Sequence, residues 1–166
     1  MGSRDLVLYL DFDGVLHHSQ VAWSPQIGPY LAAPARYTLF QHADLLAQLL
    51  EPWPHVKIVL TTTWAYRYGL DYSVARLPPG LCSRVVGTIY AQGLKYPDDF
   101  ARMPRGMQVA GDAATRKPGR WIALDDDDEG WPREHRHRLI KTHMYEGLNK
   151  PGVIKQLNAK LAEMHE

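Results

Sequence analysis

The amino-acid sequence predicts an α/β fold: a doubly wound, Rossmann-like parallel sheet with helices on both faces and a minimal cap. Three observations predict it. Short apolar runs recur along the chain, helical patterns separate them, and polar side chains follow three of the runs. Strands that alternate with helices favour a parallel sheet. At 166 residues, the chain is expected to form one domain over residues 1–166.

The expected strands are continuous in hydropathy rather than alternating, as in a sheet that is covered on both faces. They are LVLYL (6–10), VKIVL (56–60), WIAL (121–124) and RLIKT (138–142), with RVVGTIY (84–90) as a weaker fifth candidate. Parallel strands need a long crossover between successive members, so we expect helices between them.

Two stretches show helical spacing. Residues 38–51 repeat their leucines every three or four positions, and the pattern stops before Pro52. Residues 151–166 open with a proline, which is favoured in the first turn of a helix, and then place apolar side chains on one face. Both stretches are therefore expected to be helices that pack against the sheet.

Two connections lack such a pattern and are expected to be irregular loops. They are residues 17–37, which are rich in Pro, Tyr and Trp, and residues 91–105. Neither is long enough for a separate cap domain, so the active face should be open. His17 and His18 begin the first loop. Loop histidines without a designated partner are expected to be exposed, and the alternative is that these two reach a substrate.

Composition excludes several classes of protein. The 19 basic and 18 acidic side chains give a net charge of +1, which argues neither for nor against a nucleic-acid partner. Cys82 is the only cysteine, so disulfides cannot hold the fold, and we expect a reducing, cytoplasmic location. No apolar run is long enough to span a bilayer, so no membrane partner is expected.

Polar side chains follow the first three strong strands. Asp11 and Asp13 follow the first, Thr61 and Thr62 the second, and the acidic run 125–128 the third. Because the carboxyl ends of parallel strands meet at one edge of a sheet, these side chains should converge. Carboxylates that converge there would repel each other, and a hard divalent cation such as Mg²⁺ removes that repulsion. The sequence therefore predicts a metal site.

Three segments carry a resemblance to a known family. LDFDG, IVLTTTW and WIALDDD, in this order, resemble motifs one, two and four of the haloacid dehalogenase-like (HAD) phosphohydrolase superfamily. With GTIY, GWP and a late GL, the chain is similar to small HAD domains without a large cap, some of which are attached to RNA-repair modules. The resemblance implies a Mg²⁺-dependent phosphatase that cleaves a phosphate monoester through an aspartyl-phosphate intermediate.

The resemblance also implies roles for individual residues. Asp11 would be the nucleophile, and Asp13 would be the general acid and base. Gly14 would let the chain turn sharply in the substrate-binding loop, so that both carboxylates point at one centre. Mg²⁺ would be held by Asp11, by the backbone carbonyl of Asp13, and by Asp125 or Asp126.

The phosphoryl group itself needs hydrogen-bond donors and a cation. Thr61 is expected to donate its hydroxyl and its backbone N–H to a phosphoryl oxygen, with Thr63 as the alternative if the strand ends later. Thr62 is expected to contact the substrate. For the cation there are two candidates. Arg105 begins the expected helix RGMQVAGDAA and is favoured, and Lys117 lies in the connector before the third strand.

The substrate stays open at this level. An open site accepts a phosphorylated small molecule or the phosphate on a nucleic-acid end. Two other functions are compatible with the same residues: a non-hydrolytic metal- and phosphate-binding module of a larger complex, and a phosphotransferase that passes the phosphoryl group to an alcohol. Trp64 is expected only to pack. Other aromatic side chains could stack on a base, although aromatic residues in this number are more often part of a core: Trp23, Tyr30, Tyr37, Tyr66 and Tyr68.

Overall fold

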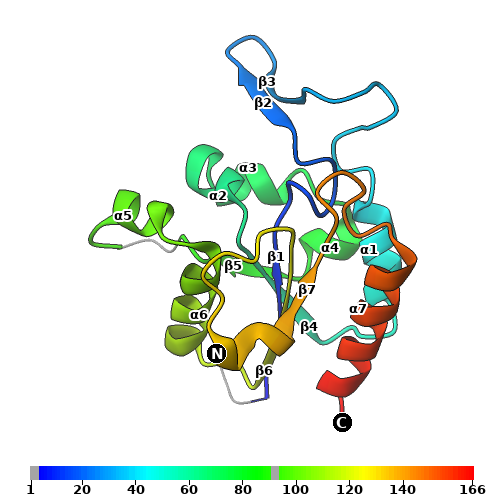
Figure 1. Cartoon of the computed structure of the whole chain (residues 1–166), viewed down its shortest axis with the longest axis vertical. Helices are drawn as coiled ribbons and strands as arrows, with labels where there is room; N and C mark the ends of the chain where they lie inside the picture. Colours follow the sequence, from blue (N-terminus) through cyan, green and yellow to red (C-terminus); the bar gives the residue numbers. More distant parts are fainter. Residues whose placement is uncertain (1–3, 91–93) are drawn as a thin grey trace.

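The structure, a computed structural model, describes residues 4–90 and 94–166 (Figure 1). Five parallel strands form one sheet in the order β5-β4-β1-β6-β7. Their bounds are β1 Leu6–Leu10, β4 Val56–Leu60, β5 Val85–Thr88, β6 Arg120–Asp125 and β7 Leu139–Lys141. The predicted doubly wound α/β sheet is confirmed, and the first motif strand lies at its centre.

The strand predictions hold with small changes at the ends. The third predicted strand extends by one residue on each side, and the weaker candidate over 84–90 is a strand at the sheet edge. The fourth is shortened because residues Arg133–Arg138 form a 3₁₀ helix, η1, that runs directly into β7.

Seven α-helices accompany the strands in the part of the chain that the structure describes. They are α1 Ala43–Leu50, α2 Thr63–Tyr68, α3 Leu70–Val74, α4 Pro79–Cys82, α5 Pro97–Arg102, α6 Arg105–Arg116 and α7 Pro151–Met164. The helix predicted over 38–51 begins later, because Phe40 has a left-handed backbone (φ 58°) that a helix does not allow. The helix predicted over 151–166 is confirmed as α7.

Alternate side chains of the central strands pack into two cores, one on each face of the sheet. On one face, Leu8 and Leu10 of β1 pack with Leu46 of α1 and Leu157 of α7. On the other, Val7 and Tyr9 belong to the core that includes residues of α6 and Trp121 of β6. Figure 1 shows α6 on the opposite side of the sheet from α1 and α7.

The loop predicted over 17–37 is partly wrong, because it contains an antiparallel hairpin. Its strands are β2 Val21–Ser24 and β3 Gly28–Leu31, and the hairpin projects beyond the carboxyl end of the sheet (Figure 1). Within the region 91–105, residues 91–93 lie outside the described residues, and α5 and the first residue of α6 occupy part of the remainder.

These additions are small, so the cap is minimal as predicted. Among the described residues, no helix combines the length and the apolar character that crossing a membrane requires.

Candidate active site

The first motif and the acidic motif lie side by side because β1 and β6 are hydrogen-bonded neighbours. Leu10 pairs with Leu124, and the backbone N–H of Asp11 donates to the Leu124 carbonyl at 3.3 Å. Asp11 and Asp125 are both buried, at 4% and 1% exposure. One carboxylate oxygen from each of Asp11, Asp125 and Asp126 lies within 4.8 Å of the others. We refer to these three residues as the acidic triad.

Gly14 shapes the turn that places the triad. Its φ of +76° lies in the left-handed region, which favours glycine. A Cβ at this position would be 2.2 Å from Oδ2 of Asp126, so the missing side chain is also what lets the turn pass Asp126. Thr142 holds the turn by donating its hydroxyl to the Gly14 carbonyl at 2.6 Å. The role of Gly14 as a substrate contact stays a prediction.

Arg105 reaches the triad from the first position of α6. Its guanidinium lies 3.9 Å from Oδ1 of Asp11 and 3.6 Å from Oδ2 of Asp125, and it donates to the Thr61 carbonyl. The side chain is only 10% exposed. Gly106 lets the start of α6 lie against the Trp131 backbone, because a Cβ at this position would be 2.3 Å from it. The structure thus supports the favoured candidate for the cation.

Lys117 is wrong as the alternative cation. It is an exposed residue with a left-handed backbone (φ 53°) that caps the opposite, C-terminal end of α6. A helix of this length spans roughly 18 Å. Gly119, two residues later, donates to the carbonyl of Asp5, which precedes β1. Lys117 therefore lies at the amino edge of the sheet, away from the triad.

The threonines are placed differently from one another. The Thr61 hydroxyl is buried and has no hydrogen-bond partner among the residues that the structure describes, as expected of a donor that is available to a substrate oxygen. Its backbone N–H, however, donates to the Leu10 carbonyl at 2.8 Å. The prediction that this N–H donates to a phosphoryl oxygen is therefore wrong. Thr62 is the N-cap of α2 and accepts the Trp64 N–H. Its substrate contact stays a prediction.

Asp13 lies outside the acidic triad. Its Oδ1 accepts a hydrogen bond from the indole Nε1 of Trp64 at 2.9 Å and lies 2.8 Å from Nε2 of His17. Its side chain is 31% exposed. The carboxylate is thus held apart from the triad, and the backbone carbonyl of Asp13 as a metal ligand stays a prediction.

The prediction that His17 and His18 are exposed is wrong, since their exposures are 0% and 5%. His17 is buried because Asp13 and the backbone N–H of Phe40 bind its two ring nitrogens. His18 is buried because its ring stacks on Tyr145. A signal for His17 was present in the sequence: a histidine four residues after an acidic residue, across a glycine turn.

The electrostatics of the triad favour a divalent cation. Burial, reinforced by the neighbouring Asp11, raises the pKa of Asp126 to about 7 and the pKa of Asp125 well above its usual range. Burial also raises the pKa of Asp11, and the Arg105 guanidinium opposes that change. Three carboxylates facing one guanidinium leave an excess of negative charge. Carboxylate oxygens are the ligands that Mg²⁺ prefers, so the triad fits this ion.

We expect Mg²⁺ to stabilise the protein more at high pH than at low pH. The raised pKa of Asp126 means that the folded, metal-free chain binds protons more readily than the unfolded chain. Protonation of Asp126 therefore stabilises the metal-free fold. This stabilisation is fully present below about pH 4 and is lost as the pH rises through about 7. Mg²⁺ binds the deprotonated carboxylates, so it should raise Tm by roughly 5 °C or more at pH 8 and by much less at pH 5.

Thermal unfolding with Mg²⁺ or EDTA at both pH values checks this prediction. The double variant Asp125→Asn with Asp126→Asn should lose the shift. Asp128→Asn is the matched control, because Asp128 belongs to the same acidic run but is exposed and pairs with Lys141. A shift that survives in the double variant would contradict the metal site.

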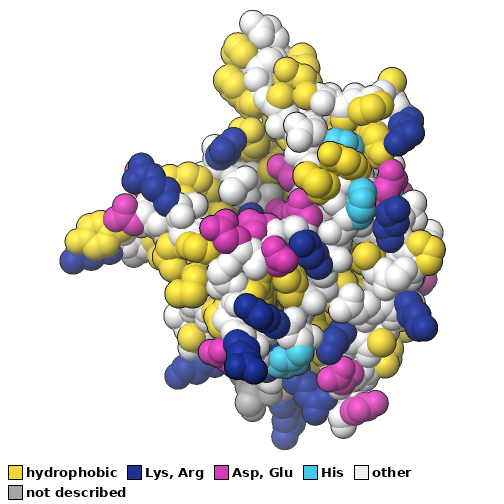
Figure 2. Space-filling view, in the orientation of Figure 1, with side chains coloured by type: hydrophobic (Ala, Val, Ile, Leu, Met, Phe, Trp, Pro, Cys, Tyr) yellow, Lys and Arg dark blue, Asp and Glu magenta, His cyan; other side chains and the backbone are white. Residues whose placement is uncertain are grey.

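The surroundings of the site are open and partly aromatic. Figure 2 shows acidic side chains gathered at the base of the hairpin, whose own side chains are largely hydrophobic. A cavity of about 60 Å³ lies beside Asp13, and its lining includes Trp23 of β2 with Trp64 and Arg67 of α2. Trp23 is 56% exposed. The site thus adjoins an aromatic ring and a cation that a substrate can reach.

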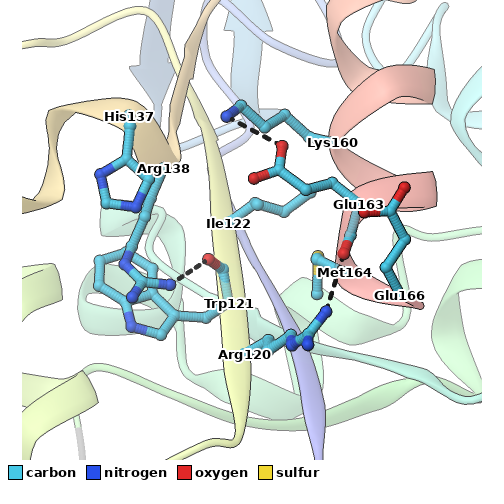
Figure 3. A pocket seen from close by; sticks show the side chains of 9 residues that line it. All are labelled: Arg120, Trp121, Ile122, His137, Arg138, Lys160, Glu163, Met164 and Glu166. Atoms are coloured by element: carbon cyan, nitrogen blue, oxygen red, sulfur yellow. Dashed lines mark hydrogen bonds and ion pairs between the residues drawn. The ribbon is translucent and has the colours of Figure 1, made fainter.

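A larger cavity of about 510 Å³ lies near the other end of β6 (Figure 3). Two of its charged side chains bind groups of Glu163 in the cavity wall: Lys160 contacts the Glu163 carboxylate at 3.4 Å, and Arg120 donates to the Glu163 carbonyl at 2.8 Å. Arg120 begins β6 whereas Asp125 ends it, so this cavity is separate from the acidic triad.

Comparison with known proteins adds one finding. Residues 7–153 match the family described as the HAD domain in Swiss Army Knife RNA repair proteins. The match runs from β1 to the start of α7 and so includes every element that contributes to the site. No curated protein and no solved structure matches the chain.

Proposed function

The chain belongs to the family of HAD domains in Swiss Army Knife RNA repair proteins, and from this premise we propose that it is a Mg²⁺-dependent phosphatase whose nucleophile is Asp11. One observation carries the proposal. Arg105 contacts both Asp11 and Asp125, and the Thr61 hydroxyl, which has no partner within residues 4–90 and 94–166, follows the neighbouring strand β4. A nucleophile, a metal-binding set, a cation and a hydroxyl donor are what phosphoryl transfer to a carboxylate requires.

The reaction proceeds in two steps. A carboxylate oxygen of Asp11 attacks phosphorus, the bond from phosphorus to the ester oxygen breaks, and Asp13 gives its proton to the departing oxygen. Asp13 then takes a proton from water, whose oxygen attacks phosphorus and releases inorganic phosphate from Asp11. Arg105 and the Thr61 hydroxyl bind phosphoryl oxygens in both steps. Mg²⁺, when bound by the triad, shields the negative nucleophile from the negative phosphate.

For the substrate we propose a phosphate at the end of a nucleic acid. The family's description points to RNA repair. The exposed Trp23 beside Asp13 offers a face on which a terminal base can stack, and Arg67 offers a cation for the adjacent phosphodiester. The minimal cap leaves room for a polymer, whereas a free small molecule would be covered on one side only.

Phosphate release from a panel of esters tests this function. The panel contains oligonucleotides with a 3′- or 5′-phosphate, nucleoside monophosphates and p-nitrophenyl phosphate, each with Mg²⁺ or EDTA. We expect release that needs Mg²⁺ and a kcat/KM for one of the oligonucleotides at least about tenfold above that of the matching mononucleotide. No release from any ester would favour a binding module. Transfer of the phosphoryl group to an added alcohol in place of water would favour a phosphotransferase.

Two substitutions in the hairpin test whether the substrate is a nucleic acid. Trp23→Ala should lower kcat/KM for the oligonucleotide by about tenfold, the size of one lost stacking contact, and should leave p-nitrophenyl phosphate unaffected. Ile27→Ala, at a 68% exposed position between the two hairpin strands, should change neither substrate. Equal losses for both substrates in Trp23→Ala would count against stacking.

A further inference from the structure

The carboxylate of Asp13 is held by two side chains to which the two-step reaction gives no part. The indole Nε1 of Trp64 donates to its Oδ1 at 2.9 Å, and Nε2 of His17 lies 2.8 Å from the same oxygen. Both side chains are buried, at 3% and 0% exposure. Two side-chain nitrogens on one carboxylate oxygen restrict the rotation of the carboxylate, and this points to a constraint on Asp13.

The second contact of His17 fixes the direction of the hydrogen bond to Asp13. The backbone N–H of Phe40 donates to Nδ1 of His17 at 3.1 Å. A ring nitrogen that accepts an N–H carries no proton, so the proton of the neutral ring is on Nε2. His17 therefore donates to Asp13. The left-handed Phe40, which delays the start of α1, supplies the group that selects this tautomer.

The turn between Asp13 and His17 restricts the positions of both residues. The backbone N–H of Gly14 donates to the His17 carbonyl at 2.9 Å, and that of Leu16 donates to Phe12 at 2.9 Å. The His17 ring packs edge-on against Phe40, with a centroid distance of 4.9 Å. The backbone and the ring contacts thus hold Nε2 in place, and Asp13 is held by a rigid partner.

We propose that His17 and Trp64 are positioning residues that occupy Oδ1 of Asp13 and leave Oδ2 as the oxygen that exchanges the proton with the substrate. The inference rests on the proposed function. With Oδ1 accepting two N–H bonds, rotation of the carboxylate is blocked. Oδ2 then gives its proton to the departing ester oxygen in the first step and takes one from water in the second. The 31% exposure of Asp13 leaves this carboxylate accessible to a substrate.

Two substitutions of His17 separate this role from a structural one. In His17→Asn, the side-chain oxygen can still accept the Phe40 N–H, but the donor to Asp13 is lost. In His17→Gln, the amide nitrogen reaches the place of Nε2 and keeps that donor. We expect His17→Asn to slow the first step for a phosphorylated oligonucleotide, whose alkoxide leaving group needs a proton, by about 10–100-fold, measured as release of the dephosphorylated oligonucleotide in a single turnover. Release of p-nitrophenol in a single turnover should slow by less than about threefold, because this leaving group needs no proton.

His17→Gln should retain at least about a third of the wild-type kcat on both esters. Trp64→Phe keeps a ring in the core but removes the N–H, so it should show the same split between esters as His17→Asn. Equal slowing of the first step for the two esters, or equal losses in the two His17 variants, would show that His17 serves the fold only and would overturn the inference.

The tautomer provides a readout that does not depend on turnover. Nitrogen-15 NMR of the imidazole should show His17 protonated on Nε2 and unprotonated on Nδ1, and the Trp64 indole N–H should shift in Asp13→Asn. A proton on Nδ1 would overturn the proposed positioning, whatever the activity. Absence of turnover by the wild-type protein on every ester would instead overturn the proposed function, so the two failures are distinguishable.

Discussion

Asp11→Asn should abolish phosphate release, with kcat lowered by at least about 10³-fold on every ester that the wild-type protein cleaves. The amide has nearly the shape of the carboxylate, but it lacks the charge and the lone-pair basicity that attack on phosphorus requires. Steady-state phosphate release with saturating Mg²⁺ measures the effect. Trapping of a phosphorylated protein after acid quench should succeed with the wild type and fail with the variant.

Stability measurements keep this result from being confused with unfolding. Burial raises the pKa of Asp11, so the ionised carboxylate is a cost to the metal-free fold at neutral pH. Asp11→Asn should therefore keep or raise Tm at pH 8 in EDTA. Asp128→Asn, at the exposed end of the acidic run, should keep full activity. A well-folded Asp11→Asn protein with more than about 1% of wild-type activity would contradict the assignment of the nucleophile.

The central part of the fold was predictable because burial leaves a strong local signal. Strands covered on both faces are continuous apolar runs, and the predicted bounds of β1 and β4 agree with the structure. The juxtaposition of Asp11 and Asp125 then followed from a general property of parallel sheets. The hairpin of β2 and β3 was missed because its strands have only four residues each and form no part of the main sheet.

What sequence alone left open depends on contacts between distant segments. Nothing near His17 in the sequence indicates that the backbone of Phe40 will bind its ring, 23 residues later. Trp64 was predicted only to pack, and its hydrogen bond to Asp13 across 51 residues depends on the relative placement of α2 and the first motif. Arg105 and Lys117 were hard to distinguish because both flank α6, and only the direction of α6 decides which end faces the triad.

Arg105→Ala should lower kcat/KM by about 10²–10³-fold, because the guanidinium lies against the buried carboxylates of Asp11 and Asp125 and is the group that we propose to bind the phosphoryl oxygens. Lys117→Ala should change kcat/KM by less than about twofold, since Lys117 is exposed at the far end of α6. Arg105→Lys should fall between them, because one ammonium cannot bind two groups as a planar guanidinium does. Phosphate release from the preferred ester with saturating Mg²⁺ measures all three.

For Arg105→Ala we also expect an effect on thermal stability. Asp11 and Asp125 raise the pKa of Arg105 although burial lowers it, so the attraction between these charges outweighs the cost of burying the guanidinium. Without Arg105 the two carboxylates face each other uncompensated, and Tm in EDTA should fall more steeply with rising pH than in the wild type. Mg²⁺ should restore Tm, since it supplies positive charge at the triad, but it should not restore kcat/KM, since the N–H donors that we propose Arg105 offers to the phosphoryl oxygens are still missing. A silent Arg105→Ala beside an inactive Lys117→Ala would reverse the assignment of the cation.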